Sequence, residues 1–563
     1  MPEYQSPGIY VEETSFRAKA IEGVSTTTAG FIGPTRYGPD KIGPPLLTSL
    51  GEFERIYGDG RPLAFAGEPG KRDNSMWHAV RAFFANGGKR LHVARVLDPG
   101  AACAASPDKA LRARFPGAAG NGRVVFSARP GPNLMTAPGV LPATVSAGDI
   151  VQVNGECDAA QKPVWRRVAA GTPETFVALR GTHSAIALSP AAVGIARAQS
   201  ISVSFIPFRA RKLRVILDGL EADAAAIARH FPETPADDAQ ACSLPIIVER
   251  IADATLHGGI VHLSGGSDGA MPSASLYAGT TAAEGVGTGL KAFEAIDDIA
   301  IVAAPALAAL APDEVRAGVA LLQQHVERMR YRMAVVDSGQ GQSLAEVRAF
   351  RAGIDSKHMA LYYPWLRVRD PIARKEILLP PSGFVAGIYA RSDTERGVWK
   401  PPANEVVIGA IGPERLLGPT EQEVLNPEGI NCFRVFEGRG LRLWGARTLS
   451  SDPEWKYVNV RRYLAYLERS IDCGTQWAVF ERNDATLWAN VRSMIEDFLF
   501  NEWRRGALLG DKPEEAFLVR CDRTTMTQND LDNGRLICLV GVAPIKPAEF
   551  IIFRIGQRTA DAV

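Results

Sequence analysis

Residues 299–337, IAIVAAPALAALAPDEVRAGVALLQQHVERMRYRMAVVD, carry the pattern that decides the fold. The stretch opens with IAIVA and closes with MAVVD, two short runs that are apolar on both faces. Strands with two apolar faces are typical of parallel sheets that helices cover on both sides. Between the two runs, Val315, Val319, Leu322 and Val326 recur at helical spacing. The stretch therefore predicts a strand, a helix and a second, parallel strand.

The same alternation continues on both sides of this stretch. Downstream, Ser343 and Glu346 have the spacing of a capping box, and residues 358–368 (HMALYYPWLRV) predict a further strand. Upstream, SMWHAVRAFFANGG predicts a helix that Ser75 caps and that two glycines end, and KRLHVARVL follows as a buried strand. We therefore expect an α/β fold of mixed α+β character, with helices packed on a parallel or mixed sheet.

Residues 98–264 differ in character from their surroundings. They are rich in Ala, Gly and Pro and contain short β-like runs such as RVVFSA and SISVSFIPF, with few periodic helices. This composition predicts a mainly β domain inserted into a discontinuous α/β core.

Beyond residue 430 the sequence predicts two long helices, at 456–471 and 484–505, followed by a β-hairpin. The hairpin joins FLVRCDRTT to RLICLVGVAP through a polar turn at 529–534, and PAEFIIFRIGQ follows as a last strand. We expect six segments: an N-terminal arm (1–22), a first core segment (23–97), the insertion (98–264), a second core segment (265–429), a C-terminal domain facing a tube (430–543) and a C-terminal arm (544–563).

The bulk composition excludes several classes of protein. The 563 residues are 46% hydrophobic and 22% charged with a net charge of +1, which gives no basic patch for nucleic acid. Residues 1–30 show no secretory signal, and the most apolar run, 299–312, is too short to span a membrane. Seven cysteines without a CxxC pair predict reduced, mostly buried thiols. We expect a soluble, cytosolic product without direct membrane insertion.

Motifs for cofactors and metals are weak. EGVGTGLKAF (284–293) has alternating glycines but lacks the spacing and the preceding strand of a dinucleotide site. LSGGSDG (263–269) resembles an anion-binding nest, but it suits a tight turn where the insertion rejoins the core. His257 and His262 are five apart in a segment with two glycines, and His325 lies on an apolar helix. We therefore expect neither a cofactor nor a metal.

The acidic residues near strand ends are the basis of a rival interpretation. Asp337 ends a predicted strand, and Asp297 and Asp298 precede another. The carboxyl ends of strands are where α/β enzymes hold their reactive groups. No second acid, His or Cys at a meaningful spacing completes a catalytic set, so structural roles are favoured over an α/β enzyme.

Many stretches, in order, resemble the contractile tail sheath family of myophages, R-type bacteriocins and phage-like injection systems. The densest matches are SPGIYVEE, FFANGGKRLHVARV, RFPGAAGN, ALYYPWLRVRDP, WKYVNVRRYLAYLERSI and GVAPIKPAEFIIFRIGQ. The resemblance covers residues 6–97 and 263–557, and it fades at 122–262.

The resemblance implies a structural subunit that is not an enzyme. Its copies would form six-fold rings or a six-start helix around an inner tube, in a phage tail or a related particle assembled in the bacterial cytoplasm. The sheath would assemble in an extended, metastable state and contract to drive the tube through a target envelope. Baseplate and terminal cap proteins are the further partners implied, and a baseplate component of the same particle is an alternative. The insertion is expected to face outward.

The resemblance also implies that neighbouring subunits exchange terminal β-strands. Ile9, Tyr10 and Val11 suit a donated strand, because its two faces differ in polarity. At the other end, the candidate strand is apolar on both faces and contains Phe550, Ile551, Ile552, Phe553 and Ile555. The sequence leaves open whether this second strand is donated or stays in its own subunit.

One helix offers candidates for contact with the tube. Arg492, Arg504 and Arg505 lie on the predicted helix 484–505 and could face an acidic tube surface. A solvated helix face explains the same pattern equally well.

Overall fold

The computed structural model describes residues 20–135, 150–155, 157, 166–168, 175–178, 185–187, 195–207, 213–218, 228–234, 246–250, 259–281 and 287–552. The chain divides into two compact units. We call residues 27–394 and 402–456 the core unit, and residues 1–26, 395–401 and 457–563 the terminal unit.

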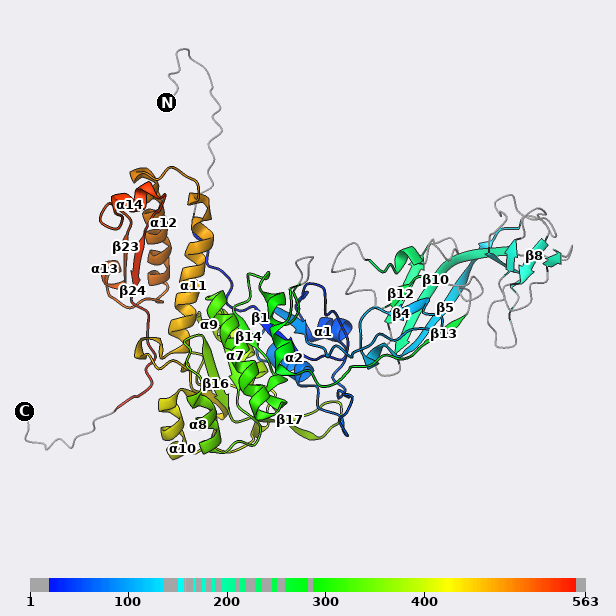
Figure 1. Cartoon of the computed structure of the whole chain (residues 1–563), viewed down its shortest axis with the longest axis horizontal. Coiled ribbons are helices and arrows are strands. Elements are labelled where there is room, and N and C mark those ends of the chain that lie inside the picture. The colour runs from blue at the N-terminus through cyan, green and yellow to red at the C-terminus, as the bar shows by residue number, and fades with distance from the viewer. Residues whose placement is uncertain are drawn as a thin grey trace, which may run out of the picture. The chain divides into compact units, whose positions relative to one another are not determined.

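A nine-stranded sheet organises the core unit (Figure 1). Its strands, in spatial order, are β19 (Glu405–Val406), β22 (Gly440–Trp444), β21 (Ile430–Phe436), β16 (Met359–Tyr363), β15 (Met333–Asp337), β14 (Ile301–Ala303), β1 (Ala29–Gly33), β3 (Leu91–Arg95) and β2 (Leu46–Leu47). The six strands from β21 to β3 are parallel; β2 and β22 pair antiparallel with the two ends of this set, and β19 pairs antiparallel with β22. The predicted strands at 299–303 and 333–337 are therefore confirmed as parallel neighbours.

Helices accompany this sheet, as the α/β pattern predicts. They are α1 (Leu50–Tyr57), α2 (Ser75–Ala85), α6 (Ala274–Ala278), α7 (Pro312–Met329), α8 (Leu344–Ala352), α9 (Ser382–Arg396) and α10 (Pro419–Leu425). Helix α7 buries the predicted apolar stripe, and the capping box of α8 at Ser343 is confirmed. The cap of α2 was assigned wrongly: Asn74, not Ser75, accepts the N–H of Trp77 at 3.1 Å.

Two glycines allow α9 to approach α2 closely. A β-carbon added at Gly383 would lie 2.5 Å from Ala79 Cα, and one at Gly387 would lie 2.6 Å from the Phe83 carbonyl oxygen. Because Gly383 and Gly387 are one helical turn apart, they face the same backbone. The two helices therefore contact each other through main chain rather than through large side chains.

The predicted strand HMALYYPWLRV is two strands in two sheets. Strand β16 ends at Tyr363, and β17 (Leu366–Arg369) pairs with β18 (Glu376–Leu379) and β20 (Gly412–Pro413). Pro364 lies between them and has no N–H to continue the ladder. The prediction of one continuous strand was wrong because the residues on both sides of Pro364 have the same apolar pattern.

The region predicted as an insertion is mainly β among its described residues. Its principal sheet has the order β13–β5–β10–β6–β7–β8–β9, with β11 also paired to β10. The strands are β5 (Gly122–Asn133), β6 (Ile150–Val153), β7 (Arg166–Val168), β8 (Thr175–Ala178), β9 (Ala185–Ala187), β10 (Ile195–Pro207), β11 (Leu213–Asp218) and β13 (Ile260–Leu263); β4 (Leu111–Ala113) and β12 (Ile246–Val248) form a separate pair. All of these pairings are antiparallel, in contrast to the core sheet.

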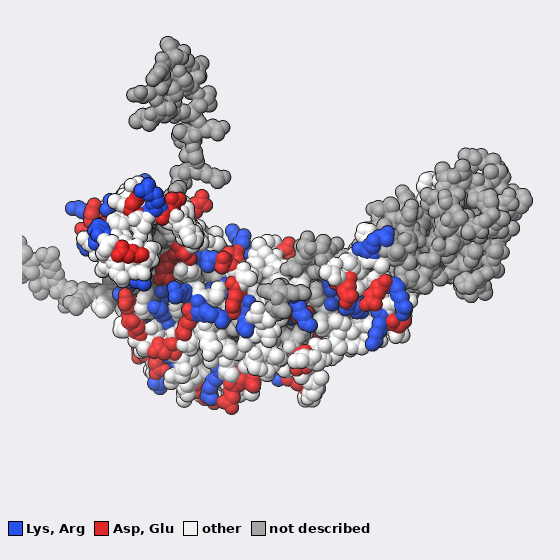
Figure 2. Space-filling view, turned by 45° about the horizontal axis from the view of Figure 1, so that its top comes forward, with Lys and Arg blue, Asp and Glu red and all other residues white. Residues whose placement is uncertain are grey.

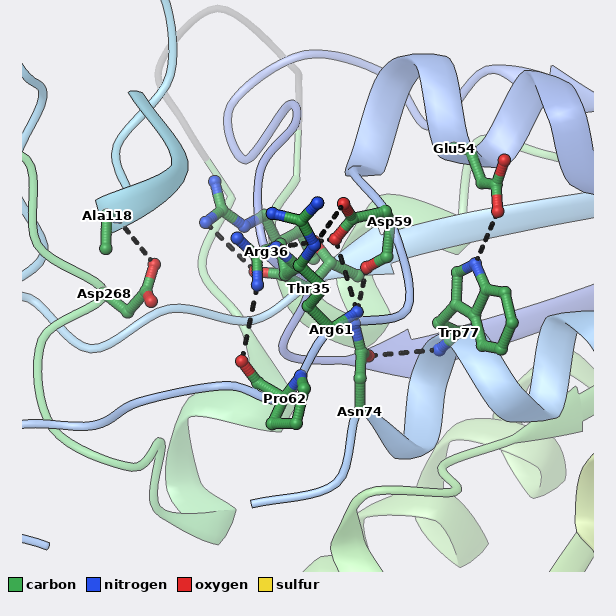
Figure 3. Close-up of polar contacts among 11 residues, drawn as sticks. Thr35, Arg36, Glu54, Asp59, Arg61, Pro62, Asn74, Trp77, Ala118 and Asp268 are labelled. Atoms are coloured by element: carbon green, nitrogen blue, oxygen red, sulfur yellow. Dashed lines mark hydrogen bonds and ion pairs between the residues drawn. The ribbon is translucent and has the colours of Figure 1, made fainter. Parts of the chain in front are cut away.

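LSGGSDG forms the predicted turn where the β region rejoins the α/β core. Gly265 has a φ of +82°, and the Asn121 side chain both accepts from the Gly266 N–H and donates to its carbonyl at 2.8 Å. Asp268 accepts the Ala118 N–H at 3.0 Å (Figure 3). The N–H groups of Gly266 and Ser267 thus donate to Asn121 and to the Ala102 carbonyl rather than to an anion.

The terminal unit contains α11 (Val458–Thr475), α12 (Ala485–Arg504), α13 (Pro513–Ala516), β23 (Phe517–Arg520), α14 (Gln528–Asp532) and β24 (Leu539–Val542). Strands β23 and β24 form the predicted hairpin, but its turn includes α14. The boundary expected at residue 430 differs from the observed division, because β21 and β22 extend the core sheet. The other segment boundaries stay predictions.

Candidate assembly site

The segment that leads to the N-terminal arm lies along α11. The Val24 N–H donates to Ser470 Oγ at 3.1 Å, and Arg462 donates to the Thr26 carbonyl at 3.0 Å. Ile21 fits against Gly474, where an added β-carbon would lie 2.7 Å from Ile21 Cγ1. We call residues 20–26 the N-terminal root. It runs along most of α11, from Arg462 near the start of the helix to Gly474 near its end.

The segment that leads to the C-terminal arm is held near the start of the same helix. Asn459 donates its amide to the carbonyls of Ile545 at 3.0 Å and of Trp399 at 2.8 Å. The Tyr457 hydroxyl donates to the Glu549 carboxylate at 3.2 Å. We call residues 543–549 the C-terminal root. It follows directly after β24.

Ile21, at the outer end of the N-terminal root, therefore lies at the C-terminal end of α11, whereas the C-terminal root is held at the start of the helix. Helix α11 has 18 residues, which corresponds to a length of about 27 Å. The sequence indicates a helix here but not that both roots contact it, because these hydrogen bonds join residues 86 to 446 positions apart.

A carboxylate ties α11 to α12. Glu502 is only 1% exposed, and it accepts from the hydroxyls of Tyr463 at 3.3 Å and Tyr466 at 3.2 Å. Burial raises the pKa of Glu502, and the guanidinium of Arg505, 3.0 Å away, opposes that rise. Sequence reasoning missed this residue, although an acid on an otherwise apolar helical face was a visible signal.

The outer face of hairpin β23–β24 exposes two leucines beside Arg520 and Gly541. Leu518 and Leu539 are 49% and 56% exposed, while Val519 on the opposite face is buried. In the described part of the chain these two strands form a two-stranded sheet, joined on one side only by the Leu509 N–H donating to the Ala543 carbonyl. Such edges leave backbone groups that can pair with an added strand.

The start of the predicted C-terminal strand is highly exposed. Phe550, Ile551 and Ile552 are 72%, 72% and 79% exposed and belong to no strand of the described chain. The remaining candidates for strand exchange, Ile9, Tyr10, Val11, Phe553 and Ile555, lie outside the described residues.

The three candidate arginines do not form one stripe. Arg492 lies 3.8 Å from Glu496, and Arg505 pairs with the buried Glu502. Arg504 is exposed, but it lies about 18 Å along α12 from Arg492 and about 120° around the axis. On the face in Figure 2, acidic and basic side chains alternate rather than gather by sign.

Comparison with known proteins decides the family. The model of the phage tail sheath protein central domain matches residues 279–449, and that of the phage tail sheath C-terminal domain matches residues 450–558. The chain belongs to the contractile tail sheath family. The matched C-terminal domain contains both α11 and the β23–β24 hairpin.

Individual relatives agree with this assignment. The tail sheath protein of Burkholderia phage BcepMu is 30% identical over 200 residues, 32% of this chain and 41% of its own. A protein assigned as a prophage major tail sheath protein in Pseudomonas aeruginosa strain UCBPP-PA14 is 27% identical over 227 residues, 40% of this chain. The chain thus spans 57% or less of these two relatives' lengths.

Comparison with solved structures finds the same fold in a contractile sheath. The sheath of the extracellular contractile injection system PVC, solved in its contracted state, superposes with a TM-score of 0.54 at 20% identity, over 99% of both chains. The mixed multi-sheet fold expected from the sequence is confirmed by this match.

In this sheath-family chain the acidic residues of the rival enzyme hypothesis are far apart in the sheet. Asp298 precedes β14 and pairs with Arg90 at 2.6 Å. Asp337 ends β15, is buried, and accepts the Ser382 N–H at the start of α9 at 2.6 Å. Parallel strands place these positions at opposite ends of the sheet. Asp337 therefore accepts a hydrogen bond from the first residue of α9, whereas the sequence favours a loop cap for it.

Burial gives Asp337 a testable pH dependence. Desolvation raises its pKa to about 7, against hydrogen bonds from Ser382 that lower it. Because the buried carboxyl prefers to be protonated, its contribution to the free energy of unfolding is fully present below about pH 4. This contribution is lost as the pH rises towards 7 and the carboxyl ionises. We expect Asp337→Asn, which keeps an acceptor for Ser382, to be more stable than wild type at pH 8 by about 1–4 kcal/mol.

Urea unfolding of both proteins at pH 4.5 and pH 8 measures this difference. The exposed Asp313, changed to Asn, is the matched control and should leave the pH dependence unaltered. A variant less stable than wild type at pH 8 would mean that the ionised carboxylate is what caps α9.

A crevice of about 720 Å³ lies at the carboxyl ends of β1, β14 and β15, where α/β enzymes hold ligands. Three of its charged side chains have structural partners: Arg72 pairs with Glu68, Arg316 with Asp313, and Glu346 completes the capping box of α8. The described residues contain no group of three metal-ligating side chains, and none of their helices is both long and apolar enough to span a bilayer.

The remaining candidate residues have ordinary surroundings. His325 is buried and lies 2.8 Å from Arg332, and His262 is exposed on β13, while His257 lies outside the described residues. Gly289 packs against the backbone of Gly279 rather than around an open cradle. The expectation of mostly buried thiols is wrong for the described cysteines, since Cys157 and Cys473 are exposed.

Proposed function

We propose that this chain, a member of the contractile tail sheath family, is a sheath subunit whose copies polymerise around an inner tube in an extended metastable state. The copies are joined by exchanged terminal strands and contract to drive the tube into a target envelope. The observation that carries this proposal is the anchoring of both arms to α11, with an exposed apolar segment, residues 550–552, beyond one root.

The donor strands are the two arms. Phe550, Ile551 and Ile552 expose a contiguous apolar surface that a folded monomer has no reason to leave in water. A neighbouring subunit that covers both faces of this strand removes that surface from water. This argument favours donation over pairing within the same subunit. Residues 1–19, with Ile9, Tyr10 and Val11, are the second donor.

The acceptor is the β23–β24 hairpin. A two-stranded sheet is marginal by itself and gains stability from each strand added to its edges. Its outer face contains Leu518 and Leu539, which match the apolar faces of the donors. Added strands would convert the hairpin into a four-stranded sheet built from several subunits.

Helix α11 then links one joint to the next. Each subunit receives strands on its hairpin and donates strands through roots held along α11. Flexible joints would help these links survive a rearrangement, and the candidates are residues 14–19, outside the described residues, and the segment around Pro544 and Pro547. A lattice linked in this way can change its packing during contraction without losing its connections.

Contact with the tube is assigned to exposed residues of α12. Arg504 and Arg492 are the candidates, whereas Arg505 forms an ion pair with the buried Glu502. We expect the sheath to bind baseplate and terminal cap proteins and to assemble in the bacterial cytoplasm. We also expect the insertion, residues 98–264, to face outward from the sheath.

Negative-stain microscopy of the purified full-length chain tests this function. We expect hollow cylinders of uniform diameter under assembly conditions. Closed rings of a single layer in every condition would favour a baseplate component. A monodisperse monomer throughout would contradict the sheath and would favour the α/β enzyme.

A further inference from the structure

Two cysteines lie opposite each other at the open end of the acceptor hairpin. The last pair of the β23–β24 ladder is Arg520 with Leu539, so the next step of the antiparallel register pairs Cys521 with Cys538. The two thiols are within hydrogen-bonding reach of each other and are unlinked in this structure.

The ladder places this pair at a position that suits a disulfide. The Ala543 N–H donates to the Ala516 carbonyl, which marks that pair as a hydrogen-bonded one. Hydrogen-bonded and non-hydrogen-bonded pairs alternate along an antiparallel ladder, so the Cys521–Cys538 pair is non-hydrogen-bonded. The Cα atoms of such pairs are about 4.5 Å apart, within the range that a disulfide spans without backbone movement.

The two thiols differ in access. Cys521 is 2% exposed and belongs to the apolar core between the hairpin and α12, whereas Cys538 is only partly buried. Burial raises the pKa of both thiols, that of Cys538 to about 12, which keeps them protonated and slow to react near neutral pH. An oxidant reaches Cys538 first.

We propose that Cys521 and Cys538 form a disulfide within one subunit when the protein meets an oxidising medium. A small disulfide such as oxidised glutathione reacts with the Cys538 thiol to give a mixed disulfide and one glutathione thiol. The Cys521 sulfur then displaces the second glutathione and closes the cross-link. The two protein thiols lose two hydrogens and two electrons, and one oxidised glutathione becomes two reduced molecules.

The cross-link closes the loop of residues 522–537, which includes α14. It fixes the ends of β23 and β24 in the register that an added strand requires. Any effect of the cross-link on sheath assembly rests on the proposed function. The formation of the cross-link does not, because both cysteines lie in the same chain.

Mass spectrometry of the full-length chain tests the site directly. The protein is incubated with oxidised glutathione, its remaining thiols are alkylated under denaturing conditions, and its peptides are identified. We expect a linked pair of peptides containing Cys521 and Cys538 that is 2 Da lighter than their sum. Cys521→Ala and Cys538→Ala should each abolish it, and Cys473→Ser, at an exposed cysteine without such a partner among the described thiols, should not.

Thermal unfolding provides a second measurement that needs no variant. The oxidised protein should unfold about 5 °C higher than the same sample after reduction. Full alkylation of both Cys521 and Cys538 after oxidation, while Cys473 has formed a mixed disulfide, would overturn the proposal. A linked pair found in protein that forms no cylinders would leave the cross-link established and the sheath function refuted.

Discussion

Deletion of residues 1–15 is expected to abolish cylinders while leaving the subunit folded. The N-terminal root, residues 20–26, remains on α11 in this variant, so the packing of Ile21 and the bond from Val24 to Ser470 persist. The deletion removes only the strand that a neighbour would receive. Negative-stain microscopy measures the polymers, and circular dichroism with thermal unfolding measures the fold.

The matched control replaces residues 1–15 by a Gly-Ser linker of the same length. This control keeps the length and flexibility of the arm but removes the β-forming residues Ile9, Tyr10 and Val11. It should fail to polymerise as completely as the deletion does. Cylinders from either variant would show that the N-terminal arm is not a joint.

The second large effect is expected for Gly383→Ala. In a helix interior, replacing Gly by Ala normally stabilises a protein by up to about 1 kcal/mol. Here the new β-carbon would lie 2.5 Å from Ala79 Cα and 2.6 Å from the Ala79 carbonyl oxygen. Both are backbone atoms, so α9 must move away from α2. We expect the free energy of unfolding to fall by about 2 kcal/mol or more.

Urea unfolding measured against Gly412→Ala checks this expectation. An added β-carbon at Gly412 has no atom within 4 Å, and this control should change the stability by less than about 0.5 kcal/mol. A stabilised Gly383→Ala variant would mean that the two helices do not touch through their backbones.

The parallel sheet could be predicted from sequence because its signals are local. The runs at 299–303 and 333–337 are apolar on both faces, and the helix between them has a clear stripe. The capping box at Ser343 was visible for the same reason. Errors occurred where two local signals competed, as between Asn74 and Ser75, which can both cap α2.

Other features depend on contacts that sequence spacing does not reveal. The extension of the core sheet by β21 and β22 moved the boundary expected at residue 430, since a strand's sheet is decided by its neighbours. The anchoring of both roots on α11 joins residues far apart in the chain. Arg505 looked like a free surface charge until the buried Glu502 beside it was known.

The most direct test of strand exchange is a cryo-EM map of the assembled polymer at a resolution that shows side chains. We predict two additional strands beside β23 and β24 of every subunit, one containing Ile9–Val11 and one containing Phe550–Ile555, each traced to a different neighbour. Density that leads both strands back to the α11 of the same subunit would contradict the account.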